Sequence, residues 1–472
     1  MKSLSTDALN RRSFLSHSLC AAAATLAGPT IFSARAEGVF RVGEAHVDST
    51  PPKGIELAGF HYKVGGNPRY ITDIRQKTAV RALVLQKGET QVALISVDIA
   101  GVSDTMAVRV QQAVAAKTGI PAVNVRLCAT HTHSMPTFAF WRQWGTTPED
   151  YMKTVEAKAV EAVVRAQADC AEGVAHIGSQ QAVGGNFNRT SKTWKTDADY
   201  STDSTDDERW LDTMLHVLYF ERGAGKHNIL WYNFAAHPVC YADGEAGPDW
   251  PGLVTQSIQD SLKVTPSYLQ GHAGDVNPGD GVGRRGEAEQ PANAVVEALN
   301  GAMNSLQKID VDVLRSETTI FQMSLDLENY RNWLATYKAD PTACASGNWV
   351  DAGFAKEWYE ANANRKWAAP KYPASISAVQ LGSVGLAFQP SELFSFYGIK
   401  ARHNSPFDHT LVTGYTDGFI GYVADPKSFN KGDGGQYAAM TVPMILDIPP
   451  YTPEAGRELS QGLSALLKST AV

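Results

Sequence analysis

The chain has 472 residues, of which 43% are hydrophobic, and its formal net charge at pH 7 is −7. This length exceeds the usual size of a single hydrophobic core, so it predicts either two lobes or one large α/β domain. A mildly acidic chain without a block of lysines or arginines argues against a protein that binds nucleic acid, and against one held on an anionic lipid surface.

The first 36 residues are typical of an export signal. Asn10-Arg11-Arg12-Ser13-Phe14-Leu15 is a twin-arginine pattern, an apolar stretch follows over residues 19–32, and Ala34-Arg35-Ala36 has the small residues of a cleavage site. The apolar stretch is too short to span a bilayer, and no later window reaches roughly 18 apolar residues. We therefore predict a twin-arginine signal peptide at residues 1–36, rather than a short buried helix. The Tat export machinery would deliver a mature chain without a transmembrane segment to the periplasm or the medium.

Strand and helix signals alternate in the first part of the mature chain. Strands are predicted at residues 80–86, 91–98 and 123–129. Ser103 predicts the N-cap of a helix that ends at Gly119. A second helix is predicted to start with Thr147 as its cap and Pro148 at its first position. This order indicates an α/β fold in which mixed β-sheets are flanked by helices, with the site at the carboxyl end of a strand.

The rest of the chain continues the same pattern with one interruption. Residues 190–208 are polar and acidic and predict a loop, and strands are predicted at residues 215–221, 229–235 and 376–387. Residues 326–368 are rich in Trp, Tyr and Asn and predict a helical insertion. No clean linker is present, so we expect one large domain over residues 38–472.

A pair of histidines follows the predicted strand at 123–129, within Thr130-His131-Thr132-His133-Ser134. In an extended chain, residues two apart face the same side, so both imidazoles can point into one pocket. Histidine is the commonest metal ligand, and neutral imidazole suits Zn²⁺. The alternative is a pair of hydrogen-bonded loop histidines with no metal.

Two further motifs favour the metal. In Asn233–Pro238 an apolar strand again ends in a histidine, His237, which is followed by proline. Gly271–Pro278 is a glycine-rich turn that carries an aspartate and an asparagine, and its glycines permit backbone to line a ligand site. Each motif alone is consistent with a structural turn, but three in one chain indicate a single metal-dependent site.

These motifs resemble those of the neutral (alkaline, non-lysosomal) ceramidases, which are zinc-dependent amidases. That family carries Thr-His-Thr-His-Ser, Asn-x-x-x-His-Pro and Gly-Asp-Val-Ser-Pro in this order. The resemblance continues at Asn188-Arg189, Pro390-Ser391-Glu392, Gly421-Tyr422-Val423 and Gln436-Tyr437. It runs from about residue 38 to the C-terminus. It implies the family's catalytic domain, without the C-terminal immunoglobulin-like domain that ceramidases also carry.

The resemblance also implies the roles of single residues. One Zn²⁺ per chain would be bound by His131, His237, Glu392 and Tyr422. The reacting carbonyl or its tetrahedral intermediate would be contacted by His133, Arg189 and Tyr437, and the catalytic set would include Asp275 and Asn277. The alternative for Glu392 is a carboxylate in the first turn of a helix, and the alternative for Tyr422 is a residue of a core strand.

The sequence departs from the family near the substrate. Asn277 replaces the family's serine, so a hydroxyl role there is lost, although asparagine still donates a hydrogen bond. Met135-Pro136-Thr137 replaces Gly-Pro-Gly, and the aromatic run over residues 138–144 either lines a substrate entrance or packs half-buried. His272 stands where the family usually has asparagine. The expected lack of the immunoglobulin-like domain argues against action on ceramide within a membrane.

We therefore expect an exported zinc-dependent hydrolase that uses metal-activated water to cleave a linear amide, such as an N-acyl amide, in a small-molecule or lipid-like substrate. One alternative keeps the metal but cleaves an ester, a lactone or a sugar-derived substrate. The other is a non-catalytic periplasmic binding protein with a vestigial metal site. The retention of Arg189 argues against the binding protein, because a purely structural metal needs no oxyanion donor.

Overall fold

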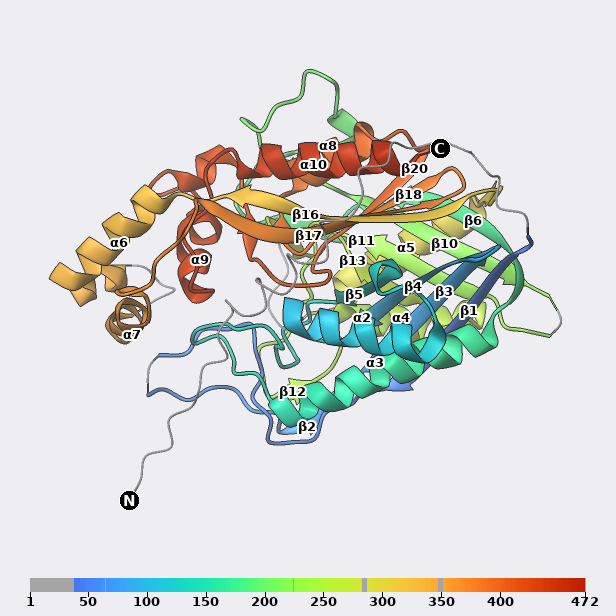
Figure 1. The fold of residues 1–472 in the computed structure, drawn as a ribbon, viewed down its shortest axis with the longest axis horizontal. Coiled ribbons are helices and arrows are strands. Elements are labelled where there is room, and N and C mark those ends of the chain that lie inside the picture. Colours follow the sequence, from blue (N-terminus) through green and yellow to red (C-terminus); the bar gives the residue numbers. More distant parts are fainter. Residues whose placement is uncertain (1–37, 64, 224, 282–286, 347–350, 472) are drawn as a thin grey trace. The chain divides into compact units, whose positions relative to one another are not determined.

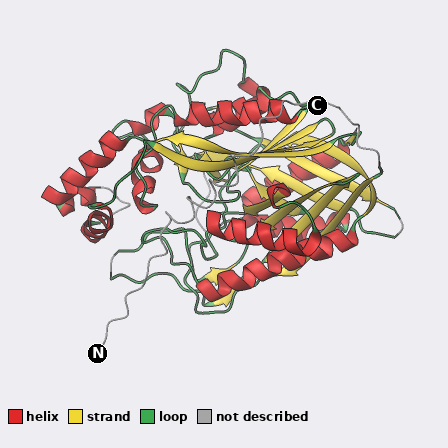
Figure 2. Cartoon of the chain, viewed as in Figure 1, coloured by secondary structure: helices red, strands yellow, loops and turns green. Residues whose placement is uncertain are grey.

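Two stacked β-sheets form the centre of the fold, as seen in the computed structural model (Figures 1 and 2). The structure describes residues 38–63, 65–223, 225–281, 287–346 and 351–471. The predicted signal peptide lies outside these residues. The described residues belong to one compact unit.

The larger sheet has nine strands in the order β13-β11-β10-β6-β1-β3-β4-β5, with β15 paired to β6. Most neighbours are antiparallel, but β4–β5 and β11–β13 are parallel pairs. The strands are β1 (Phe40–Asp48), β3 (Ala79–Lys87), β4 (Thr90–Val97), β5 (Val125–Ala129), β6 (Ala171–Gln181), β10 (Met214–Arg222), β11 (Ile229–Phe234), β13 (Ser267–Gln270) and β15 (Gln307–Ile309).

The second sheet has four strands in the order β16-β17-β18-β20, and its β18–β20 pair is parallel. Its strands are β16 (Leu314–Ser324), β17 (Lys371–Leu381), β18 (Val384–Phe388) and β20 (His409–Thr413). Four short pairs complete the strands: β2 (Asp73–Ile74) with β12 (Glu245–Ala246), β7 (Asn186–Asn188) with β14 (Val276–Pro278), β8 (Lys195–Thr196) with β9 (Trp210–Leu211), and β19 (Glu392–Leu393) with β21 (Tyr422–Val423).

Helices cover the outer faces of both sheets. The larger sheet is covered by α2 (Asp104–Thr118), α3 (Glu149–Asp169), α4 (Trp250–Leu262) and α5 (Glu289–Asn304), and the smaller one by α8 (Ser395–His403) and α10 (Ala455–Thr470). The remaining helices are α6 (Leu327–Ala339), α7 (Ala352–Asn362) and α9 (Val442–Ile445). Among the described residues, no helix has the length and hydropathy needed to cross a bilayer.

Side-chain alternation along the strands explains why the layers stack in this order. On β3, Val84 points toward α2 and α3, while Leu83 and Leu85 point toward the second sheet. Successive side chains of a strand face opposite sides, so a strand that is apolar on both faces must be covered on both. The predicted α/β fold of mixed sheets flanked by helices is confirmed, and its layers are helix, sheet, sheet and helix.

Several predicted element boundaries need correction. The second helix starts at Glu149 and its N-cap is Pro148, which makes no side-chain capping hydrogen bond, so the cap predicted at Thr147 is wrong. The strand predicted over residues 376–387 is a hairpin, because the chain turns at Gly382 with φ of 56°. In contrast, Ser103 caps α2 through the backbone N–H of Met106, as predicted.

Candidate metal centre

The carboxyl ends of the parallel strand pairs meet at one place. The chain leaves β5 toward His131, leaves β11 toward His237 and leaves β18 toward Glu392. Ligand sites of α/β folds lie at carboxyl ends of parallel strands, where loops can present side chains without breaking the sheet. The three side chains are buried, with exposed fractions of 2% or less.

The backbone at His131 is not extended. Its φ is 64°, in the left-handed region, so the prediction that both imidazoles share a face of an extended chain gives the wrong reason. The rings of His131 and His133 nevertheless meet edge-on, with centroids 4.8 Å apart and Nε2 atoms 3.2 Å apart. They come together because the chain turns, since the backbone N–H of His131 donates to Ile99 O on the neighbouring strand's extension.

The hydrogen bonds of His131 and His237 fix their tautomers. His131 Nδ1 lies 2.6 Å from Ala100 O, and His237 Nδ1 lies 2.9 Å from Val276 O. A carbonyl oxygen only accepts, so each Nδ1 carries the proton and each neutral ring has its lone pair on Nε2. Both Nε2 atoms point at Glu392 Oε2, at 3.4 and 3.1 Å.

This geometry fits a cation. Two imidazole lone pairs and a carboxylate oxygen would repel one another at such distances unless a positive charge lay between them. A backbone carbonyl behind each imidazole is the usual support of a metal-binding histidine. The ligand atoms of His131, His133 and His237 lie within 4.8 Å of one another. The donor set of two imidazoles and one carboxylate suits Zn²⁺.

The charge states agree with this set. Burial lowers the pKa of His237 to about 4, so the ring is neutral at pH 7. Burial alone would raise the pKa of Glu392, but the contacts with His131 and His237 outweigh it and lower the pKa to about 2. The centre therefore offers a neutral imidazole at His237 and a negative carboxylate at Glu392.

His133 differs from the other two histidines. Burial, followed by the nearby imidazoles, lowers its pKa well below the ordinary value. Its Nδ1 is buried and has no hydrogen-bond partner among the described residues. Gly59, whose φ is 93°, lies against this ring, where a Cβ would come within 2.4 Å of Nδ1. Among the described residues, no carbonyl fixes the tautomer of His133, in contrast to His131 and His237.

Tyr422 and Arg189 lie beside the three histidines. Glu392 and Tyr422 are directly paired across β19 and β21. Arg189 Nη2 donates to Tyr422 Oη and to Gly274 O, each at 2.7 Å, and Nη1 lies 3.4 Å from Asn277 Oδ1. Burial raises the pKa of Tyr422 well above its ordinary value, although Arg189 opposes the shift. The phenol of Tyr422, on the strand that pairs with Glu392, is therefore held in place by the positively charged Arg189.

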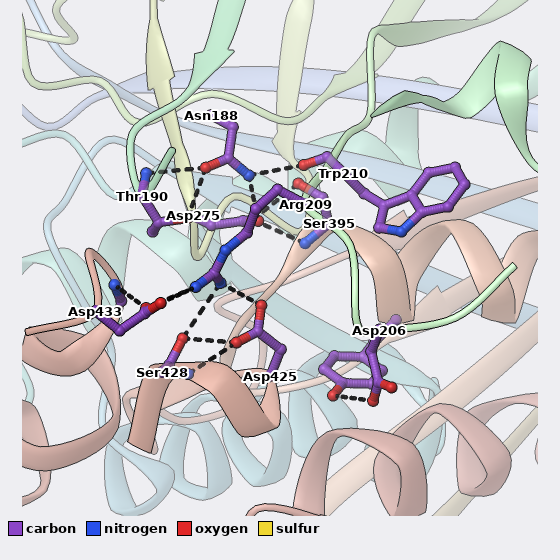
Figure 3. A network of polar contacts seen from close by, with 12 residues as sticks. Asn188, Thr190, Asp206, Arg209, Trp210, Asp275, Ser395, Asp425, Ser428 and Asp433 are labelled. Carbon is purple, nitrogen blue, oxygen red and sulfur yellow. Dashed lines mark hydrogen bonds and ion pairs between the residues drawn. The ribbon is translucent and has the colours of Figure 1, made fainter. Parts of the chain in front are cut away.

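Asp275 is buried within a network of hydrogen bonds. Its Oδ1 accepts from the backbone N–H and the hydroxyl of Ser395, and its Oδ2 accepts from Asn188 Nδ2, all at 2.8 Å (Figure 3). Its backbone carbonyl accepts from Arg189 N. Burial raises its pKa to about 6. Through these contacts Asp275 positions Arg189 and the start of α8, and its catalytic role stays a prediction.

A second group of polar contacts, which the sequence did not indicate, lies next to Asp275 (Figure 3). Arg209 forms ion pairs with Asp425 and, at 2.6 Å, with Asp433. These aspartates flank η5 (Pro426–Phe429) and precede η6 (Tyr437–Thr441), a π-helix that carries Tyr437. Arg209 therefore fastens the segment of Tyr437 to the strand region that follows Arg189. No sequence motif indicates Arg209, because an isolated arginine is typical of a surface residue.

A pocket opens on His131, His133 and Glu392. Tyr437 lines it, and its ring centroid lies 6.1 Å from that of Tyr422. Within the aromatic run, Trp141 and Trp144 line the pocket, while Phe138 is fully buried in the core and not half-buried as one alternative had it. Sequence reasoning missed Tyr415, whose ring stacks on His131 at 4.3 Å between centroids.

The fold of this chain resembles that of the neutral ceramidases. Residues 40–245 match the family described as neutral/alkaline non-lysosomal ceramidase, N-terminal. This range contains the first two histidine motifs, so the resemblance predicted from them is confirmed.

Solved structures agree with the family match. The chain is similar to a neutral ceramidase from Pseudomonas aeruginosa, with a TM-score of 0.68 and 16% identity over 92% of this chain and 75% of that chain. A ceramidase complexed with C2 gives a TM-score of 0.66 and 16% identity over 91% and 75% of the two chains. A search of curated protein sequences gave no match.

Proposed function

We propose that this protein is a zinc-dependent amidohydrolase that cleaves a linear amide, such as an N-acyl amide. The observation that carries the proposal is the convergence of His131 Nε2 and His237 Nε2 on Glu392 Oε2, with both Nδ1 atoms fixed by carbonyls. Two neutral imidazoles and one carboxylate leave net positive charge on a divalent ion. When bound there, zinc would acidify a water molecule and polarise the substrate carbonyl.

The residues around the centre are assigned different roles in metal binding and catalysis. We assign metal binding to His131, His237 and Glu392, with Tyr422 as the fourth ligand. His133, whose Nδ1 has no described partner, would take and return the proton at the leaving nitrogen. Arg189 carries a permanent positive charge beside the pocket, which suits the oxygen on which negative charge develops.

Three further residues would support this chemistry. Tyr437 lines the pocket and would donate to the same oxygen as Arg189. Asn277 and Asp275 would hold Arg189 in place through its guanidinium and its backbone N–H.

The proposal includes export. The twin-arginine pattern and the cleavage-site pattern before residue 38 support a Tat substrate that reaches the periplasm or the medium. Cell fractionation tests this part: the wild-type protein is expected outside the cytoplasm, and a double Arg11→Lys, Arg12→Lys variant is expected to remain inside. Equal export of both would overturn it.

Hydrolysis with and without metal tests the activity. The zinc-loaded protein would be incubated with N-acyl-sphingosine, short N-acyl amides and matched esters. We expect amide hydrolysis that disappears with a chelator and returns when zinc is added. Turnover that survives complete removal of metal would contradict the proposal. A zinc-loaded protein that hydrolyses nothing in the panel would favour the binding-protein alternative.

A further inference from the structure

The loop over residues 414–420, between β20 and β21, lies against the imidazole of His131. Tyr415 stacks on this imidazole, with 4.3 Å between the ring centroids and 27° between the ring planes. Phe419, from the same loop, is also nearly parallel to it, at 5.8 Å and 17°. Tyr415 is fully buried and is not among the residues that line the pocket. Its ring therefore contacts His131 and not the space that is open to a substrate.

This loop is fixed on the strand that leads to the histidine. β5 is an edge strand of the larger sheet, and the loop runs beside it in the antiparallel sense. Ala129 N, at the end of β5, donates to Tyr415 O at 3.0 Å. Arg126 Nη1, also on β5, donates to the Asp417 carboxylate at 2.7 Å, and both of these side chains are buried. Because β5 holds the loop and also leads to His131, the two stacked rings are fixed by the same strand.

Backbone strain gathers at this contact. His131, Tyr415 and Asp417 all have a positive φ, of 64°, 52° and 57°. Non-glycine residues keep such conformations only where their surroundings over-determine them, and they cluster at functional sites. The stacked rings are among the contacts that keep His131 and Tyr415 in this conformation.

The hydrogen bond of His131 leaves one rotation of its ring open. The contact of Nδ1 with Ala100 O directs that atom, but the imidazole can still tilt about the line that joins them, since the outer torsion of histidine is broad. Tilting would move Nε2 away from Glu392 Oε2, which lies at 3.4 Å. At His237, in contrast, both the backbone N–H and Nδ1 point at Val276 O. A flat ring stacked on the imidazole removes the remaining rotation.

Resting on the proposed function, which places a zinc ion between His131 and Glu392, we infer that Tyr415 is a positioning residue for the metal. Its ring holds the imidazole of His131 at the angle that binding requires. The hydroxyl has no part in this role, because Tyr415 Oη is buried and has no hydrogen-bond partner among the described residues. Removal of the flat ring should therefore weaken zinc binding, whereas removal of the hydroxyl should not.

Zinc affinity tests this role without relying on turnover. The dissociation constant of zinc would be measured by competition with a chromophoric chelator for the wild type, Tyr415→Phe and Tyr415→Leu. We expect an unchanged constant in Tyr415→Phe and one about 10–100-fold higher in Tyr415→Leu, the usual effect of losing a contact that orients a ligand. The visible spectrum of the Co²⁺-loaded protein, which reports the geometry of the ligands, should change in Tyr415→Leu alone. Equal affinity and equal spectra in the wild type and Tyr415→Leu would overturn the inference.

Tyr232→Leu is the matched control for lost packing. Tyr232 is also a fully buried tyrosine whose Oη has no partner among the described residues. It packs on Tyr268 in a different core cluster and does not line the pocket. This variant should be destabilised in urea as Tyr415→Leu is, but it should bind zinc as the wild type does. An equal loss of zinc affinity in both variants would overturn the specific role of Tyr415.

A second variant covers the case in which Tyr415→Leu does not fold. Methionine fills a similar volume and adapts to its surroundings, but it has no flat face. Tyr415→Met should therefore fold and still bind zinc more weakly than Tyr415→Phe. Equal zinc affinity in these two variants would overturn the role of the ring.

The two proposals fail in different ways. Weaker zinc binding in Tyr415→Leu, with no hydrolysis of any amide by the wild type, would remove the proposed function and leave the positioning role standing. Zinc-dependent hydrolysis with equal zinc affinity in all variants would do the reverse. A wild-type protein that binds no zinc would overturn both.

Discussion

His131 combines an unusual backbone conformation with an aromatic ring stacked on its imidazole. Its φ of 64° places it in the left-handed region, and Tyr415, which stacks on it, has a φ of 52°. Such conformations in residues other than glycine cost roughly 1–3 kcal/mol each and persist where surrounding contacts over-determine them. Here the Tyr415 carbonyl accepts from Ala129 N at the end of β5, and the buried pair of Arg126 and Asp417 anchors the loop that follows. Strain of this kind is invisible in a sequence.

Arg189 gives the prediction that belongs to this scale. Arg189→Ala should lower kcat by about 100–1000-fold, the usual effect of losing one oxyanion donor. Zinc content should not change, because Arg189 is not a proposed ligand. The check is kcat beside zinc per chain, with Arg189→Lys as the variant that keeps the charge and should recover part of the rate. Unaltered turnover in Arg189→Ala would remove its proposed role.

At the scale of elements, the sequence predicted those helices and strands that a local residue pattern determines. β3 and β4 follow from runs of β-branched and aliphatic residues, and α2 follows from Ser103 and Gly119 at its two ends. The segment η5–η6–α9 was not predicted, because each piece is too short to show a helical period. This segment nevertheless carries Tyr437 and residues that line the pocket. Arg209 and Asp447 hold it through contacts with distant parts of the chain.

Buried His216 on β10 predicts how stability depends on pH. Burial, followed by the charge of Arg402, lowers its pKa to about 3, while Asp212 opposes the shift and His409 and His272 add to it. The unfolded chain takes up a proton at this ring below about pH 6.5, but the folded chain does not until about pH 3. Stability is therefore fully present above pH 6.5 and falls by about 1.4 kcal/mol per pH unit as the pH drops through this window.

The variant His216→Asn should lose this dependence. Asparagine can still accept from Ser179 Oγ, which lies 2.7 Å from His216 Nδ1. Between about pH 6.5 and pH 4, its unfolding free energy from urea titrations should decline less steeply than that of the wild type, by about 1.4 kcal/mol per pH unit. Parallel curves for the two proteins would show that His216 does not titrate in this way.

At the scale of the whole molecule, the order of strand and helix signals was enough to predict an α/β fold of mixed sheets flanked by helices, but not its layers. The stacking of two sheets depends on pairings such as β16 with β17, between strands that the helices α6 and α7 separate in sequence. Such long-range pairing leaves no local pattern. The site could be predicted further than the fold, because His131 and His237 both follow buried strands whose carboxyl ends meet.

The central claim is that His131 and His237 bind zinc while His133 serves the substrate. The most direct test is the zinc content of purified His131→Ala, His237→Ala and His133→Ala proteins beside the wild type, measured by atomic emission. We predict about one zinc per chain in the wild type and in His133→Ala, which should be inactive, and almost none in the other two. Full zinc in His237→Ala, or loss of zinc in His133→Ala with retention in His131→Ala, would contradict the account.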